Sequence, residues 1–113
     1  MDNSKQHEKI HSLMPEFSKI AGIHEFDLRQ HCNRRVVCEV RGIIWMLLYK
    51  YFKKSHEVSY AIIGEYFCGR DHATIIHGIN RTKELLALRK ADGKFAYPHL
   101  RKLKNKMEKL FKK

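Results

Sequence analysis

A run of hydrogen-bonding side chains at residues 70–77 offers the chemistry by which proteins contact nucleic acids. Asp71 can accept a hydrogen bond from the amine of cytosine, and His72 can donate to or accept from a base edge. Ala73 offers a methyl group to the methyl of thymine. Thr74 and the free backbone N–H groups of a first helical turn can grip a phosphate. Apolar residues follow at once, so we predict that this run is the tip of a DNA-recognition helix.

Basic residues flank this tip on both sides. Arg70, in the preceding turn, is placed for a phosphate or a guanine, while His77 and Arg81 lie one and two turns further on and suit backbone contacts. The acidic Asp71 repels phosphate, so general electrostatic attraction does not explain it. Two interpretations stay open for Asp71: it reads bases, or it only caps its helix.

A nuclease that used Asp71, His72 and His77 as base and metal ligands is an alternative. Glu65 is the only other carboxylate near this run, and the chain has neither an HExxH motif nor zinc-finger spacing. His72 and His77 are five residues apart, which does not place them squarely on one helix face. We therefore expect no enzyme activity, no cofactor and no metal site.

The chain as a whole is strongly basic. Its 113 residues include 23 Lys and Arg against 12 Asp and Glu, a formal net charge of +11. Such a surface attracts nucleic acid first and an anionic membrane second, and a basic protein with neither partner is the plain alternative. The length fits one domain and leaves no room for a large nucleotide-binding domain as well.

Composition also bears on the compartment. The longest apolar run, residues 43–49, is too short to span a membrane. Cys32, Cys38 and Cys68 form no CxxC pair, and without a signal peptide they are typical of free thiols in a reducing compartment. We expect a cytoplasmic protein that does not bind membranes.

Apolar spacing predicts an all-helical fold. Residues 4–21 form one face, but Pro15 predicts either a kink or a new helix. Residues 23–34 are less regular, with Asp27 as a possible cap of a short turn and a polar, basic loop from residue 30 onward. The strongest core helix covers residues 36–53 and should be buried on more than one side.

A helix-turn-helix follows a polar connection at residues 53–57. Ser59 is a plausible N-cap for a helix through Phe67, and Cys68 to Arg70 form a tight turn in which Gly69 can take positive φ. Asp71 then caps a longer helix to about residue 89. Because many helical hairpins share this pattern, the polar tip in a basic chain is what favours DNA binding.

The C-terminal segment, residues 94–113, is predicted to be a basic amphipathic helix with Pro98 near its start. Its apolar stripe would dock on the bundle, leaving a solvated lysine face. A second contact to the DNA backbone and a surface for a protein partner or a membrane are the alternatives.

The run Gly69-Arg70-Asp71-His72-Ala73-Thr74-Ile75-Ile76-His77-Gly78 resembles the signature of the C-terminal DNA-binding domain (domain IV) of the bacterial replication initiator DnaA. The similarity covers roughly residues 10–90. It implies an all-α, Trp-repressor-like helix-turn-helix in residues 1–93. It also implies a double-stranded DNA partner with DnaA-box-like sites.

The resemblance also assigns roles to individual residues. It places Arg35, next to Arg34, in the minor groove and Arg41 on a phosphate. Asp71, His72 and position 73 would face bases in the major groove. Arg70, Thr74 and His77 match positions near the bases or phosphates, and the segment from Ser59 is similar to the first helix of the motif. We count Ser59 and Arg81 among the expected DNA contacts as well.

Departures from the family pattern narrow the expected function. Ala73 replaces a Ser or Thr and loses a hydroxyl, and Cys68 replaces a glycine. No GxxxxGK[ST] motif occurs, so the chain by itself is not an ATP-driven initiator. It is either a fragment of one or a small stand-alone protein, which the segment after Lys94 favours. We expect sequence-specific duplex binding in replication initiation, its control or transcriptional regulation; a charge-driven, non-specific nucleic-acid binder is the alternative.

Overall fold

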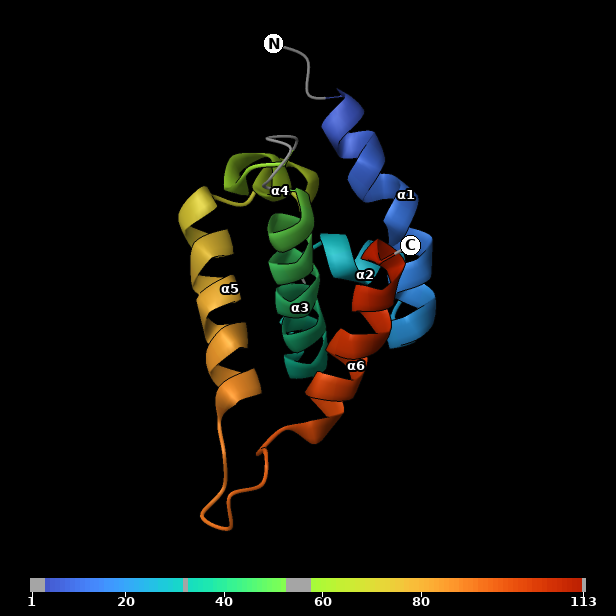
Figure 1. Ribbon diagram of the computed structural model, residues 1–113. Coiled ribbons are helices and arrows are strands. Elements are labelled where there is room, and N and C mark those ends of the chain that lie inside the picture. Colours follow the sequence, from blue (N-terminus) through green and yellow to red (C-terminus); the bar gives the residue numbers. More distant parts are fainter. Residues whose placement is uncertain (1–3, 32, 53–57, 113) are drawn as a thin grey trace.

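The computed structural model describes residues 4–31, 33–52 and 58–112, and a central helix organises them (Figure 1). This helix, α3 (Arg35–Phe52), is the one that apolar periodicity predicted, beginning one residue earlier. Every residue from Val40 to Leu48 is buried. Helices α1, α2, α4, α5 and α6 all contact α3, which confirms that it is buried on more than one side.

The remaining helices pack against α3. They are α1 (Ser4–Ala21), α2 (Glu25–Arg29), α4 (Tyr60–Tyr66), α5 (His72–Ala87) and α6 (Pro98–Glu108), followed by the short 3-10 helix η2 (Lys109–Phe111). In the part of the chain that the structure describes, a single bridge between Arg89 and Phe95 is the only β-type pairing. The predicted all-α class is confirmed.

Two local predictions needed correction. Helix α1 runs unbroken through Pro15, so no new helix starts there. Asp27 lies inside α2, and the N-cap is His24, whose Nδ1 accepts from the Phe26 N–H at 3.1 Å. The predicted connection at residues 53–57 and the predicted free thiol of Cys32 lie outside the described residues.

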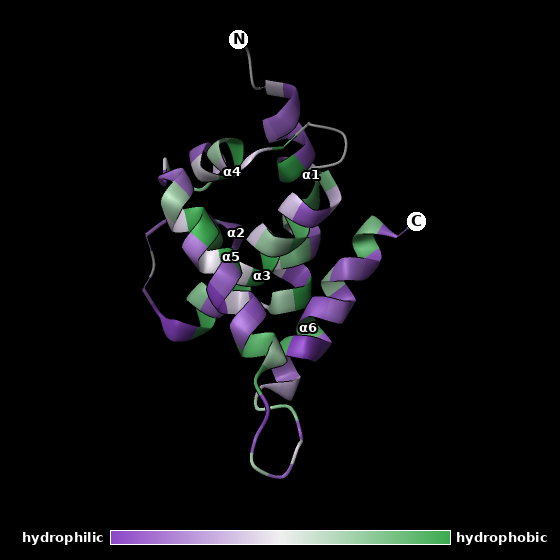
Figure 2. Ribbon diagram, turned by 60° about the vertical axis from the view of Figure 1, so that its left-hand side comes forward, coloured by the Kyte–Doolittle hydropathy of each residue, from purple (hydrophilic) through white to green (hydrophobic). Residues whose placement is uncertain are grey.

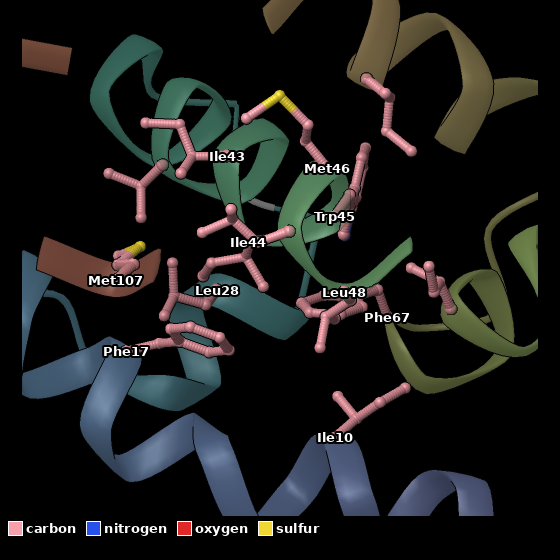
Figure 3. Packing of buried hydrophobic residues seen from close by; sticks show 14 of the residues in the cluster. Ile10, Phe17, Leu28, Ile43, Ile44, Trp45, Met46, Leu48, Phe67 and Met107 are labelled. Atoms are coloured by element: carbon pink, nitrogen blue, oxygen red, sulfur yellow. The ribbon is translucent and has the colours of Figure 1, made fainter. Parts of the chain in front are cut away.

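The core joins side chains from helices distant in sequence (Figure 3). Phe17 of α1, Leu28 of α2 and Met107 of α6 lie near Ile44 of α3, whereas Ile10 of α1 lies towards Leu48 of α3 and Phe67. All of these side chains are fully buried. Burying a side chain of this size contributes about 1.5–3 kcal/mol. The apolar face of α3 therefore fixes the other helices in place.

Close approach of backbones fixes α5 against α3. A Cβ at Gly42 of α3 would collide with the Thr82 hydroxyl of α5. A Cβ at Gly78 of α5 would lie 2.6 Å from the Trp45 ring of α3. Because interiors are close-packed, two small residues at this contact hold α5 at one distance and rotation.

Helix α6 docks on the bundle through its apolar stripe. Leu100 and Met107 are buried in the common core, and the Phe111 ring stacks on Tyr51 with centroids 4.8 Å apart. The outer side of α6 is mainly hydrophilic in Figure 2. The docked position matches the first interpretation of this segment, and its predicted boundary at residues 93/94 falls in the connection between α5 and α6.

A buried carboxylate ties α6 to α3. Glu108 accepts hydrogen bonds from Lys50 at 2.8 Å and from the Tyr51 hydroxyl at 2.6 Å, and Lys104 pairs with its other oxygen at 2.9 Å. Burial alone would raise the pKa of Glu108, but these three bonds outweigh it and lower the pKa from 4.5 to about 2.

The Glu108 contribution to stability should depend on pH. Because its pKa is lowered by folding, the stabilisation is present above pH 4.5 and is lost as pH falls towards 2. We expect Glu108→Gln to lower the free energy of unfolding at pH 7 by about 1–3 kcal/mol, and by less at pH 3. Urea titrations at both values measure this, with the exposed Glu16→Gln as control. An equal loss at both values would contradict the assignment.

Candidate DNA-binding surface

The helix-turn-helix consists of α4, a turn at residues 67–71 and α5. Ser59 caps α4, since its Oγ accepts from the Ile62 N–H at 3.3 Å, as predicted. Gly69 has φ of 67°, as expected, and Cys68 also takes a positive φ of 64°. The Arg70 N–H donates to the Gly64 carbonyl at 2.8 Å. A Cβ at Gly64 would collide with the Arg70 carbonyl oxygen, so this glycine allows the turn to close.

The tip of α5 presents polar groups to solvent. Asp71 is the N-cap, and its Oδ1 accepts from the Ala73 N–H at 3.3 Å. The same oxygen lies 2.9 Å from His72 Nδ1, and the two side chains are 67% and 66% exposed. Capping is thus confirmed, yet the Asp71 carboxylate keeps most of its surface accessible to a ligand.

Helical geometry sorts the remaining α5 residues by face. Because successive residues turn by about 100°, Ala73, His77 and Asn80 share the outward face. Thr74 and Arg81 lie on the adjoining side, and Ile75 and Ile79 are buried. Thr74, His77 and Arg81 are exposed and Ala73 is partly exposed. The predicted contact residues of α5 therefore form one continuous surface.

A cleft of about 380 Å³ lies between this surface and the start of α3. Residues of the predicted basic loop and of the first turns of α3 form one wall. Arg70 of the turn and residues of α5 form the other. From the first side come His31, Asn33, Arg35, Cys38, Glu39 and Arg41; from the second come Arg70, Thr74, Gly78, Arg81, Thr82 and Leu85, with Trp45 between them. Segments about forty residues apart thus meet at one cationic hollow.

Arg35 lies at the exposed edge of that cleft, and Arg34 precedes it in the chain. The side chains of Arg34 and Arg35 are 70% and 76% exposed. Arg34 Nη2 lies 3.7 Å from the Asp27 carboxylate, and Arg35 Nε lies 3.5 Å from Glu39. The Arg35 guanidinium is largely exposed and its pair with Glu39 is long, so it can turn towards an anionic ligand.

Arg41 is placed differently from the other predicted contacts, because its residue is only 5% exposed. Its Nε donates to the Leu28 carbonyl at 2.9 Å, and its Nη2 donates to the carbonyls of Asp27 at 3.2 Å and Gln30 at 2.9 Å. The contact of Arg41 with a DNA phosphate stays a prediction. In this conformation, Arg41 instead satisfies the backbone at the end of α2.

Arg70, in the turn of the helix-turn-helix, donates to carbonyls at the same end of α2. Its Nη2 donates to the Gln30 carbonyl at 2.7 Å. Its Nη1 donates to the backbone carbonyls of Arg29 at 2.8 Å and Phe67 at 2.6 Å. Burial, and then the positive charge of Arg41, lower the pKa of Arg70 from its ordinary value. An arginine remains charged at neutral pH even so.

Together, Arg41 and Arg70 cap the C-terminus of α2. The carbonyls of Asp27 to Gln30 follow the last helical acceptors of α2, so they need donors from elsewhere. Both cations also face the negative end of the helix dipole. We name this set of bonds, from Arg41 and Arg70 to the carbonyls of residues 27–30, the α2 clamp.

Sequence reasoning named Arg41 and Arg70 but missed the carbonyls that they hold in the α2 clamp. Nothing in the polar stretch at residue 30 showed that the Gln30 carbonyl would accept from two arginines. Arg29 was also missed: it stacks 4.0 Å from the Tyr66 ring centroid and donates to the Tyr66 carbonyl at 3.1 Å. One signal was available, because Arg41 falls on the apolar side of a core helix, where a charge must find partners.

Within residues 4–31, 33–52 and 58–112, no group of three or more His, Cys, Asp or Glu side chains is arranged to hold a metal ion. None of the described helices is long and apolar enough to cross a membrane.

Comparison with known proteins gives one result. The family model described as bacterial dnaA protein helix-turn-helix matches residues 11–82. This match runs from the middle of α1 into α5 and includes the turn, the α2 clamp and every residue that lines the cleft except Leu85. No curated protein and no solved structure matches the chain.

The α2 clamp predicts a difference between buried and exposed arginines. Arg41→Met should lower the free energy of unfolding by about 2–4 kcal/mol, because it leaves buried carbonyls without donors. Arg81→Met, on the exposed side of the cleft, should change it by less than about 0.5 kcal/mol. Urea denaturation measures both values. Equal stability of the two variants would show that the clamp does not hold α2.

Proposed function

The chain belongs to the bacterial DnaA helix-turn-helix family, and from this we propose that it binds double-stranded DNA sequence-specifically at DnaA-box-like sites. One observation carries the proposal: Arg35 and Thr74, which lies in the first turn of α5 next to the exposed Asp71 and His72, line the same cleft. A recognition helix in the major groove and an arginine in the adjacent minor groove need such an arrangement.

In the proposed complex the N-terminal turn of α5 enters the major groove. Asp71 and His72 contact base edges, and Ala73 packs its methyl against a thymine. The Asp71 carboxylate keeps its capping bond while its exposed surface accepts from a cytosine amine. Thr74, His77, Arg81 and Ser59 contact the phosphate backbone beside the groove.

The basic loop supplies the second part of the interface. Arg35, with Arg34 beside it, reaches into the minor groove, where a narrow A·T-rich segment concentrates negative potential. Arg41 and Arg70 act mainly through position in this proposal, because their donors hold the end of α2. They fix where the loop leaves α2, and with it the distance between the two groove contacts.

The biological use that we propose is replication initiation, its control or transcriptional regulation, since residues 69–78 resemble the signature of a replication initiator. The proposed chemistry is binding without catalysis, because the polar tip contacts DNA through side chains that need no cofactor. Binding by charge alone is the competing function, and salt dependence separates the two.

A titration with two duplexes tests the proposed function. Anisotropy is measured with a DnaA-box duplex and a scrambled duplex of the same composition, at about 50 and 200 mM salt. We expect both affinities to fall with salt while the preference for the box duplex persists. Equal affinity for the two duplexes at both salt concentrations would leave only charge-driven binding.

Base reading by Asp71 can be separated from capping. Asp71→Ser should keep a cap acceptor yet lose the base contact, so discrimination between box and scrambled duplexes should fall by about 1–3 kcal/mol. Asp92→Ser removes the same charge from an exposed turn and should leave the discrimination unchanged. Full discrimination by Asp71→Ser would reduce Asp71 to a cap.

The proposed minor-groove contact of Arg35 predicts a dependence on the base composition of the flanking DNA. Arg35→Ala should weaken binding to a duplex with an A·T-rich flank more than binding to one with a G·C-rich flank. Lys106→Ala, on the exposed side of α6, is the control for loss of one positive charge. An equal loss on both flanks would mean that Arg35 contacts phosphate only.

A further inference from the structure

A second hollow, of about 580 Å³, lies on the other side of α5, between α3, α5 and α6. It shares no lining residue with the cleft beside the basic loop. On α5 its residues are Ile79, Lys83, Leu86 and Ala87, which helical geometry places away from Thr74 and Arg81. We call this hollow the α5–α6 groove.

The floor of the α5–α6 groove is apolar and recessed. Met46 of α3 and Ile79 and Leu86 of α5 line it, and each is between 3% and 8% exposed. Tyr49 borders it and stacks on Tyr60 with ring centroids 3.9 Å apart. A ligand must therefore insert side chains to reach these atoms.

The rim of the groove is basic. Lys50, Lys83, Arg101 and Lys104 surround the floor. Glu108 offsets part of this charge because it bonds Lys50 and Lys104. Lys83 is exposed on the α5 side, and Arg101 is held on the α6 side by its bond to the Leu86 carbonyl at 2.9 Å.

A short connection keeps the α6 side of the rim in place. The Phe95 ring lies between two guanidinium groups, with Arg101 at 3.7 Å and Arg89 at 4.0 Å from its centroid. The Lys90 N–H donates to the Lys94 carbonyl at 2.7 Å. Cation–π contacts of this kind contribute about 0.5–2 kcal/mol each, so the rim is preformed rather than assembled by a ligand.

We propose that the α5–α6 groove binds an acidic, amphipathic helical segment of a protein partner. Apolar side chains of that segment cover Met46, Ile79 and Leu86, and its carboxylates pair with Lys83, Arg101 and the lysines beside them. Charge complementarity selects the occupant: an apolar floor within a cationic rim matches leucine-like side chains flanked by Asp or Glu.

The chemistry of the groove argues against two other anionic ligands. A DNA backbone would offer phosphates to the rim, but it has no apolar side chain for the floor. A flat anionic membrane would require protruding apolar residues, whereas the floor here is recessed. Since the proposed DNA surface lies on the other side of α5, the segment and a duplex can be bound together.

A synthetic peptide tests the proposal directly. The probe is a labelled peptide of about 15 residues with Leu on one helical face and Glu on the other. Anisotropy titrations use the full chain, alone and with a bound DnaA-box duplex. We expect saturable binding in both cases, and roughly tenfold weaker binding of an all-Glu peptide that has no apolar face.

Matched variants locate the site of binding. Lys83→Glu should weaken peptide binding about tenfold, while Lys90→Glu, the same charge change outside the groove, should leave it within about twofold. Ala87→Trp should block the groove, whereas Ala91→Trp in the connection should not. Urea denaturation of each variant confirms that it folds.

Three results would overturn the proposal. Equal effects of Lys83→Glu and Lys90→Glu, or equal affinity for the all-Glu peptide, would show that only general charge attracts the probe. Displacement of the peptide by a scrambled duplex would make the groove a nucleic-acid surface. Binding of phosphatidylserine vesicles with the same dependence on Lys83 and Ala87 would make it a lipid surface. None of these outcomes depends on whether the chain recognises DnaA-box-like sites.

Discussion

The carbonyls at the end of α2, which have no donor within their own helix, are the constraint on which the proposed binding surface depends. A helix of five residues cannot satisfy its own C-terminus, and these carbonyls lie where the chain must leave for the basic loop. Arg41 comes from the central helix and Arg70 from the turn of the helix-turn-helix, and both donate to the Gln30 carbonyl. One acceptor thereby joins three parts of the molecule, and bonds from Arg41 to the Leu28 carbonyl and from Arg70 to the Arg29 carbonyl reinforce the connection.

The consequence for binding is geometric. The contact of α5 with α3 sets the rotation of the recognition helix, through the close approach of Gly42 to Thr82 and of Gly78 to Trp45. The α2 clamp sets the origin of the loop that carries Arg34 and Arg35. The two side-chain groups that we propose for different grooves are therefore placed relative to each other by the interior, before any DNA is present. Preorganisation of this kind lowers the entropy lost on binding.

The packing of the interior leaves hollows on two sides of α5 that ligands can reach. Towards the basic loop lies a cationic cleft, and towards α6 lies a groove with an apolar floor. Because Glu108 anchors α6 to Lys50 and Tyr51 of α3, the second side is as fixed as the first. A DNA surface and a protein surface on opposite sides of one helix would let a partner bind without displacing DNA.

Local chemistry made much of the fold predictable. Ser59 and Asp71 cap helices through bonds to residues two or three positions away, and the apolar periodicity of α3 follows from helix geometry alone. The family match likewise agrees with the signature around Asp71 and His72. The unpredicted features depend on distance in sequence: Arg70 bonds a carbonyl 40 residues away, and His24, rather than Asp27, caps α2. Whether each predicted residue touches DNA is a property of a complex, which neither periodicity nor the folded chain determines.

Selection of bound duplexes from a random pool tests the central claim most directly, because it presumes no site. The account predicts enrichment of one short motif resembling a DnaA box, with an A·T-rich segment on the side that the Arg34–Arg35 edge would face. A selected pool with no common motif, or one enriched only in base composition, would contradict sequence reading by the tip of α5.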